Sequence, residues 1–393
     1  MARPNSRSIL LALFFIFLAV RYLRETGQNP YKTPVFNNSL LNRENEYRDQ
    51  FNVQNNTKCL PVDEEKPEVE VEERCALCFF GLPRSYESMV LPGLVKNVFT
   101  PNADNKCDVF LHYFHKEEEP AQRKNAGGKL NPDEIFLVEN AAKSVLGSNT
   151  TVVIVNDTDD SFLEQRKYQL ERYQETRDKN GIKVYFPFKT KFRISSLDNM
   201  VKQWHSIDKT FTMMEDYMNK HNINYTRVAM LRNDVMFLTP FNIAMVDNTE
   251  KAPDSKHFVL PGFANFPVTD RMIYGVYDAV KMWSTTRFDR IEKRAWEYKH
   301  TGVAMHSEKF MAADLLPSIE TAGYTRLRNN NVCFVRTRAA SIALWQDCVR
   351  DVPKGLEGKN MTALIEEILE RKCEKVEGDS AFCPPEFNSS VPF

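Results

Sequence analysis

One aspartate at the end of an apolar run is the residue in this 393-residue chain best suited to cation and phosphate chemistry. Asp234 follows the run from 227 to 231 (RVAML), after Arg232 and Asn233, and a second short apolar run comes next. Hard cations such as Mg²⁺ and Mn²⁺ take oxygen ligands, usually one or two carboxylates together with substrate phosphates. The pattern predicts a divalent cation held against a diphosphate, with a plain turn cap as the structural alternative.

A second candidate follows the first predicted strand, at 76–80 (ALCFF), where the chain reads Gly81-Leu82-Pro83-Arg84-Ser85. A guanidinium pairs with phosphate through two parallel hydrogen bonds, so Arg84 is a candidate phosphate ligand. The ring of Tyr86 is a candidate to stack on a nucleotide base. Gly-x-Pro is also a common turn, which is the competing interpretation.

An acidic cluster, Asp157-Thr158-Asp159-Asp160, follows the apolar run at 151–155 and is a competing cation site. Its spacing suits a cation, but the polar segment from 164 to 179 behind it favours a solvated loop with acidic turn residues. His112 and His115 form an HxxH pattern in a predicted strand. Residues three apart in a strand face opposite sides, so chelation by this pair is not expected.

The elements that must position these residues alternate along the chain, which is typical of an α/β fold with a mostly parallel sheet flanked by helices. The longest predicted helix, 196–222, carries an apolar stripe at three- and four-residue spacing that predicts a core face. Predicted strands lie at 76–80, 108–114, 151–155, 227–231, 257–260 and 332–335. Further predicted helices lie at 86–98, 132–146, 271–283, 307–316 and 361–372.

The N-terminal segment predicts a membrane anchor. Twelve apolar residues, 9–20, lie between flanking arginines, which favours an uncleaved signal-anchor over a cleaved signal peptide. A polar, acidic stretch follows. The predicted organisation is an anchor at 1–24, a flexible stem at 25–74, a catalytic domain at 75–350 and a C-terminal extension at 351–393.

Cysteines and glycosylation sequons indicate the secretory lumen. Eight cysteines, an even number, suit disulfides in an oxidising compartment, and we expect Cys373 and Cys383 to pair. Seven Asn-x-Ser/Thr sequons begin at Asn37, Asn55, Asn149, Asn156, Asn224, Asn360 and Asn388. The net charge of −1 gives no electrostatic footprint for nucleic acid, so that class of partner is not expected.

The stretch from Asn199 to Pro240, with its helix leading into MLRNDVMFLTP, resembles the segment that leads into the metal-binding motif of GT-A-fold glycosyltransferases. In that Rossmann-related fold, a strand ends in Asp-x-Asp, which binds Mn²⁺ or Mg²⁺ and the nucleotide-sugar diphosphate. This chain departs from the motif because Arg232 stands in place of the first aspartate. The likeness follows element order over roughly residues 75–350, and its one motif is short.

The resemblance implies roles for particular residues. Asp234 and His306 would hold the metal, and Glu308 would be the base that deprotonates the acceptor hydroxyl. Ser307 as a helix cap, with Glu308 in the first turn, is the structural alternative. The residues implied to bind the donor are Arg84, Tyr86, Arg232 and Asn233.

The function implied is that of a single-pass type II glycosyltransferase in the Golgi or endoplasmic reticulum, with its catalytic domain in the lumen. It would move sugar from a nucleotide-sugar donor to a glycan or glycoconjugate acceptor. Two alternatives stand beside it. One is a lumenal carbohydrate-binding or scaffold protein that keeps the fold without catalysis, and the other is a hydrolase that uses the acids at 157–160.

Overall fold

The computed structural model describes residues 73–120, 127–186, 194–247, 250–253, 255–299, 301–346, 348, 356–376 and 378–385. All of them belong to one compact unit of the chain. The predicted anchor at 1–24 and almost all of the predicted stem lie outside these residues. Among the residues that the structure does describe, no helix has both the length and the apolar character needed to cross a bilayer.

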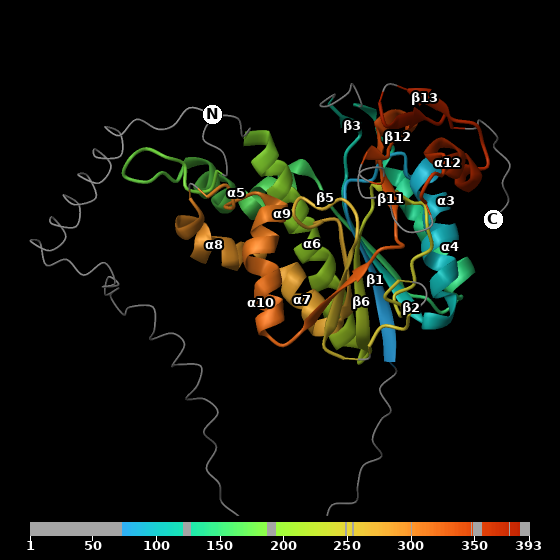
Figure 1. Ribbon diagram of the computed structural model, residues 1–393, viewed down its shortest axis with the longest axis horizontal. Helices are drawn as coiled ribbons and strands as arrows, with labels where there is room; N and C mark the ends of the chain where they lie inside the picture. Colours follow the sequence, from blue (N-terminus) through green and yellow to red (C-terminus); the bar gives the residue numbers. More distant parts are fainter. Residues whose placement is uncertain are drawn as a thin grey trace, which may run out of the picture. The chain divides into compact units, whose positions relative to one another are not determined.

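A seven-stranded sheet in the order β10-β8-β9-β6-β1-β2-β5 forms the centre (Figure 1). Neighbouring strands run parallel except around β9, which is antiparallel to both β6 and β8. This confirms the predicted mostly parallel sheet. Its strands are β1 (Glu73–Gly81), β2 (Cys107–Phe114), β5 (Val152–Asp157), β6 (Asn224–Arg232), β8 (His257–Pro261), β9 (Met272–Val276) and β10 (Thr325–Asn329).

Helices cover both faces of this sheet (Figure 1). One face packs against α3 (Leu91–Leu94) and α4 (Leu137–Leu146), and α12 (Met361–Leu369) packs on α3. The opposite face packs against α6 (Ile194–His221), α7 (Tyr277–Thr285) and α10 (Leu316–Thr321). Helices α5 (Asp159–Glu175), α8 (Arg287–Tyr298) and α9 (Ser307–Phe310) pack together against α6. Shorter helical segments are η2 (Tyr86–Val90), η3 (Val95–Phe99), η4 (Thr100–Asn105), η5 (Pro132–Phe136), η6 (Met311–Leu315) and η7 (Ala339–Ser341).

A second, antiparallel sheet begins where the first one ends. The chain leaves β6 and, after only Asn233 and Asp234, enters β7 (Val235–Phe237), an edge strand of the five-stranded sheet β13-β14-β12-β11-β7. The other strands of that sheet are β11 (Phe334–Arg338), β12 (Ile342–Leu344), β13 (Glu374–Val376) and β14 (Ser380–Phe382). A small hairpin pairs β3 (Glu118–Glu119) with β4 (Gly128–Lys129). Asp234 therefore lies at the junction of the two larger sheets.

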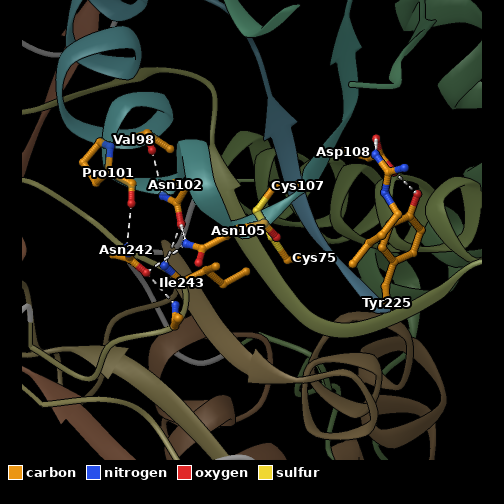
Figure 2. The surroundings of a disulfide bond; sticks show 12 residues. Cys75, Val98, Pro101, Asn102, Asn105, Cys107, Asp108, Tyr225, Asn242 and Ile243 are labelled. Carbon is orange, nitrogen blue, oxygen red and sulfur yellow. Dashed lines mark hydrogen bonds and ion pairs between the residues drawn. A yellow bond between two sulfur atoms is a disulfide. The ribbon is translucent and has the colours of Figure 1, made fainter. Parts of the chain in front are cut away.

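At the end of the central sheet where the parallel strands begin, a disulfide and buried polar groups link neighbouring segments (Figure 2). Cys75 and Cys107, paired across β1 and β2, are disulfide-bonded. The buried carboxylate of Asp108 accepts hydrogen bonds from Arg74 and from the Tyr225 hydroxyl, each at 2.7 Å. The side chain of Asn102 donates to the carbonyls of Val98 and Phe241. These contacts stabilise the end of the sheet that lies opposite the carboxyl ends of the parallel strands.

Two further disulfides join Cys333 to Cys348 and Cys373 to Cys383, which confirms the predicted Cys373 pairing. Cys78 is a buried free thiol in β1. Burial raises the pKa of this thiol, so it stays protonated at neutral pH.

Three predicted elements differ from the structure. The segment 271–283 is not one helix, because Met272–Val276 forms β9 before α7 begins. The polar segment after Asp157 is not a loop, because it forms α5, whose N-terminal Thr158 makes a capping box with Ser161. The predicted strand at 332–335 corresponds to β11, which belongs to the second sheet rather than the central one.

Replacing Gly275 with alanine is expected to cost about 3 kcal/mol or more of unfolding free energy. Gly275 has a φ of +146°, and a Cβ there would lie 2.6 Å from the His257 carbonyl oxygen and 2.8 Å from the Phe258 Cα. Strand β9 cannot move away because β6 pairs with its other edge. Urea denaturation would measure the loss.

The matched control is Gly323→Ala. Gly323 also has a positive φ, +96°, but nothing lies within 4 Å of the place that an added Cβ would take. Its substitution should therefore cost only about 1 kcal/mol, the backbone part of the effect. Equal losses at the two glycines would show that the contact with β8 has no influence.

Candidate functional site at the junction of the two sheets

The site lies where the direction of strand order reverses in the central sheet. From β1 the chain adds β2 and then β5 on one side, and returns to place β6 on the other side of β1. Open α/β sheets bind ligands at such a switch point, outside the carboxyl ends of the strands. Gly81 ends β1 and Arg232 ends β6, so the two segments that the sequence singled out meet at this point.

Three arginines surround the buried carboxylate of Asp234, which is 1% exposed. Arg232 donates from Nε to Oδ1 at 2.7 Å and from Nη2 to Oδ2 at 2.8 Å. Arg84 donates from Nη1 to Oδ2 at 2.5 Å, and the Nη1 of Arg338 lies 3.9 Å from the same oxygen. Arg84, Arg232, Asp234 and Arg338 are called the arginine cluster below.

A glutamate from the small hairpin completes the contacts of Arg84. Glu119 in β3 accepts from Nε of Arg84 at 2.7 Å and from Nη2 at 2.6 Å. Among the residues that the structure describes, the guanidinium groups of Arg84, Arg232 and Arg338 thus lie around two carboxylates, those of Asp234 and Glu119. The side chains of Arg84, Arg232 and Arg338 are 14%, 21% and 20% exposed, so all three reach solvent while Asp234 lies behind them.

Hydrogen bonds tie the loop after β1 to the end of β11 and so hold Arg84 and Arg338 beside each other. The Ser85 hydroxyl donates to the Arg338 carbonyl at 2.9 Å and accepts from the Ser341 amide at 3.0 Å. The Thr337 hydroxyl donates to the Arg84 carbonyl at 3.0 Å. Ser85 and Ser341 both have positive φ, 47° and 55°. Such backbone strain in non-glycine residues concentrates at functional sites.

The arginines keep Asp234 ionised. Burial by itself raises the pKa of this carboxyl group, but the charges of Arg232 and Arg84 and the hydrogen bonds from Arg232 outweigh burial. The pKa of Asp234 is therefore well below its usual range. At Arg338, burial and, after it, the neighbouring charge of Arg84 lower the pKa of the guanidinium.

The residues present do not fit a divalent cation at Asp234. Both carboxylate oxygens already accept guanidinium N–H groups, and the nearby carboxylate of Glu119 is occupied in the same way. A cation there would stand among three positive charges, beside carboxylates that are already occupied. The structural reason is the arginine that replaces the first acid of the motif: Arg232 takes up the carboxylate that the motif would offer to metal.

His306 and Glu308 lie together at the start of α9, with Nδ1 of His306 3.2 Å from a Glu308 oxygen. Helix α9 packs on α6, where the rings of Phe310 and Trp204 are 5.5 Å apart. The arginine cluster is instead built from β6, β11 and the loop after β1. The pairing of His306 with Asp234 as metal ligands is therefore not supported by the contacts of Asp234, which come from arginines.

Two other residues expected to bind the donor are buried. Tyr86 is 1% exposed within the core, so it offers no ring face on which a base can stack. Asn233 is fully buried and links strand ends: its amide nitrogen donates to the carbonyl of Gly81 at 3.1 Å, and its backbone amide donates to Phe80. Asn233 thus shapes the switch point rather than facing solvent.

A second polar cluster lies beside the carboxyl ends of β2 and β5. Oδ2 of Asp157 faces Nε2 of His205 at 2.6 Å and Nε2 of His112 at 3.0 Å, and all three residues are buried. Its Oδ1 accepts from Ser161 and Gln165 at 2.8 and 2.9 Å. Burial raises the pKa of Asp157, but its hydrogen bonds from His112, His205 and Ser161 outweigh burial and lower it. The expected solvated loop is wrong for Asp157.

His112, Asp157 and His205 form a donor set that could hold a transition-metal ion. The hydrogen bond on the far side of His205 opposes this: Arg166 donates from Nε to Nδ1 at 2.9 Å. Nε2 of His205 then carries the imidazole proton and donates a hydrogen bond to Asp157, so this nitrogen has no lone pair for a metal. Burial lowers the pKa of His205 to about 4, so the ring is neutral. The described contacts thus favour a hydrogen-bonded network.

This network reaches the switch point through Ser206. The Ser206 hydroxyl contacts Nδ1 of His112 at 2.8 Å and accepts the Gly81 amide at 2.9 Å. The sequence signalled His112 through the HxxH pattern and Asp157 through the acidic cluster. No local sequence pattern pointed to His205, Glu119 or Arg338, because each of them contacts its partner only after the chain has folded.

Comparisons with known proteins leave the function to be argued from the site itself. No family model matches the chain, and no curated protein matches it. Among solved structures, the chain is similar to the apo form of mouse xyloside xylosyltransferase 1, at 10% identity over 82% of this chain and 100% of that chain. The TM-score is 0.29. At this value the likeness supports no inference about fold, activity or substrate.

Proposed function

We propose that this chain is a glycosyltransferase that transfers a sugar from a nucleotide-sugar donor to a hydroxyl of a glycan or glycoconjugate. The observation that carries the proposal is the arginine cluster at the switch point of the central sheet. Three partly exposed guanidinium groups, at the end of the sheet where open α/β sheets bind ligands, suit a diphosphate. The resemblance to GT-A-fold glycosyltransferases, whose motif lies at the same strand end, indicates that the group transferred is a sugar.

The reaction joins the acceptor oxygen to the anomeric carbon of the sugar and breaks the bond from that carbon to the diphosphate oxygen. The electron pair of the broken bond stays on the diphosphate, and the acceptor proton passes to a base. Guanidinium groups aimed at the departing diphosphate would stabilise the charge that develops there. Glu308, partly exposed and paired with His306, remains the proposed base.

The proposed location is the lumen of the Golgi or endoplasmic reticulum, with the apolar segment at 9–20 as a membrane anchor. Three disulfides support an oxidising compartment. Four sequon asparagines have exposed side chains and are therefore accessible to glycosylation: Asn149, Asn156, Asn224 and Asn360. These observations agree with the proposed compartment.

Calorimetric titration of the full-length protein with UDP, UMP and uridine, and with the guanine series, tests the proposal. We expect one nucleoside diphosphate to bind about tenfold or more tighter than its monophosphate, because a second phosphate adds charge-assisted hydrogen bonds. The matching nucleotide sugar should then release that diphosphate only when an acceptor is present. No binding of either diphosphate at millimolar concentration would exclude the proposed donor.

A second candidate is a lumenal binding or scaffold protein that keeps the site without catalysis. The contacts of the arginine cluster favour it, because arginines occupy both Asp234 and Glu119, and the proposed base Glu308 lies on α9 rather than in the cluster. Such a protein would bind a nucleoside diphosphate but release none from any nucleotide sugar. Measuring whether the nucleotide sugar releases its diphosphate in the presence of an acceptor therefore distinguishes the two candidates.

A further inference from the structure

The arginine cluster has the properties of an anion site that needs no cation. Asp234 is the acid at its centre, and its two oxygens accept three hydrogen bonds from Arg84 and Arg232. Its backbone carbonyl is also occupied, by the Thr337 amide at 2.9 Å. A buried carboxylate held in this way fixes the guanidinium groups in position, and it has no capacity left to ligate a metal.

Arg338 is the member of the cluster best able to bind an anion. Its Nη1 donates to the Thr337 carbonyl at 3.2 Å and lies 3.9 Å from Asp234. Its side chain is 20% exposed, and it lies within reach of the same carboxylate as Arg84 and Arg232. A phosphate beside this guanidinium would form a charge-assisted hydrogen bond with it.

Arg84 has a further contact that a ligand can replace. Glu119 accepts from both Nε and Nη2 of Arg84, the paired edge with which a guanidinium binds a phosphate. Glu119 lies on the β3–β4 hairpin, whose Gly128 packs near Ala339 and Ala340 of η7. Glu119 therefore holds Arg84 in the orientation that a phosphate would use.

We propose that Arg84, Arg232 and Arg338 bind the diphosphate of the donor without a divalent cation, and that Asp234 is a positioning residue for these arginines. This inference rests on the proposed function, because the donor is taken to carry a diphosphate. Guanidinium groups do here what Mn²⁺ or Mg²⁺ does where carboxylates line the site. The ligand class is a nucleoside diphosphate or its sugar ester.

The test is titration of the full-length protein with the nucleoside diphosphate in excess EDTA and, separately, in excess Mn²⁺. We expect the same affinity in both buffers. The Arg338→Gln variant should bind about tenfold or more weakly in EDTA, because one charge-assisted contact is lost. Arg328→Gln, the same change on the exposed edge strand β10, is the control and should bind like the wild type.

The possible outcomes separate the inference from the function. Binding that appears only with Mn²⁺ overturns the inference and leaves the glycosyltransferase proposal standing. Absence of binding in both buffers overturns the proposed donor itself. Equal loss in the Arg338→Gln and Arg328→Gln variants would show that overall charge, and not the cluster, attracts the nucleotide. The wild-type comparison needs no variant, so it remains decisive if Arg338→Gln folds poorly.

Discussion

The Asp234→Asn protein is expected to unfold with a free energy about 3 kcal/mol lower than that of the wild type. The substitution keeps the shape of the side chain but removes the negative charge that compensates Arg84, Arg232 and Arg338. The amide nitrogen would also face a guanidinium N–H group, so two donors would oppose each other in a buried place. Urea denaturation at neutral pH measures the difference.

The control for this prediction is Asp216→Asn, the same chemical change at an exposed position on α6. It should alter the unfolding free energy by less than about 0.5 kcal/mol. A loss at Asp234 no larger than that of the control would mean that the arginines are not held by this carboxylate. The role of Asp234 as a positioning residue would then be abandoned.

The Asp157→Asn protein is expected to lose about 2–4 kcal/mol of unfolding free energy. Oδ2 of Asp157 accepts from two imidazoles, and Oδ1 accepts from Ser161 and Gln165. An amide has one oxygen, so its NH₂ group must point at donors whichever way it turns. Chemical denaturation at neutral pH measures the loss, and the exposed neighbour Asp160→Asn is the control, with an expected effect below about 1 kcal/mol.

The pH dependence gives a second readout of the same substitution. The pKa of Asp157 is lower in the folded protein than in the unfolded chain, so the charged carboxylate contributes stability above the unfolded value of about 3.9. That contribution is lost as the pH falls toward the folded pKa. The difference between wild type and Asp157→Asn should therefore be constant above about pH 5 and shrink below about pH 4. A difference that grows on acidification would contradict this assignment.

Much of the central sheet was predictable because its strands are apolar on successive residues. β1, β2, β5, β6 and β8 all lie where the sequence predicts strands, and α6 carries the predicted apolar stripe. Strand β10 (TRLRN) was missed because it is a polar edge strand with little buried surface. Strand β9 was missed because its apolar residues run without a break into those of α7, and a short apolar run does not distinguish strand from helix.

The candidate site was predictable in part, for a reason that follows from topology. Arg84 and Asp234 each follow a predicted strand, and the carboxyl ends of parallel strands share one edge of a sheet, so the sequence brings them to one site. The partners Glu119 and Arg338 were not predictable. Glu119 comes from a hairpin of two-residue strands and Arg338 from the second sheet, and neither has a local pattern that points to Asp234.

The sequence by itself determined the α/β class, the strands that carry the site and the presence of an acid and arginines at their ends. Only the tertiary structure decided what the acid does. The preference of a carboxylate for metal or for guanidinium depends on the charges within a few ångströms, because Coulomb energy falls with distance and is strongest where water is excluded. Around Asp234 those charges are arginines from three separate segments. These arginines come together only in the folded protein, where Asp234 is the centre of the proposed anion site and not the metal ligand that the sequence predicted.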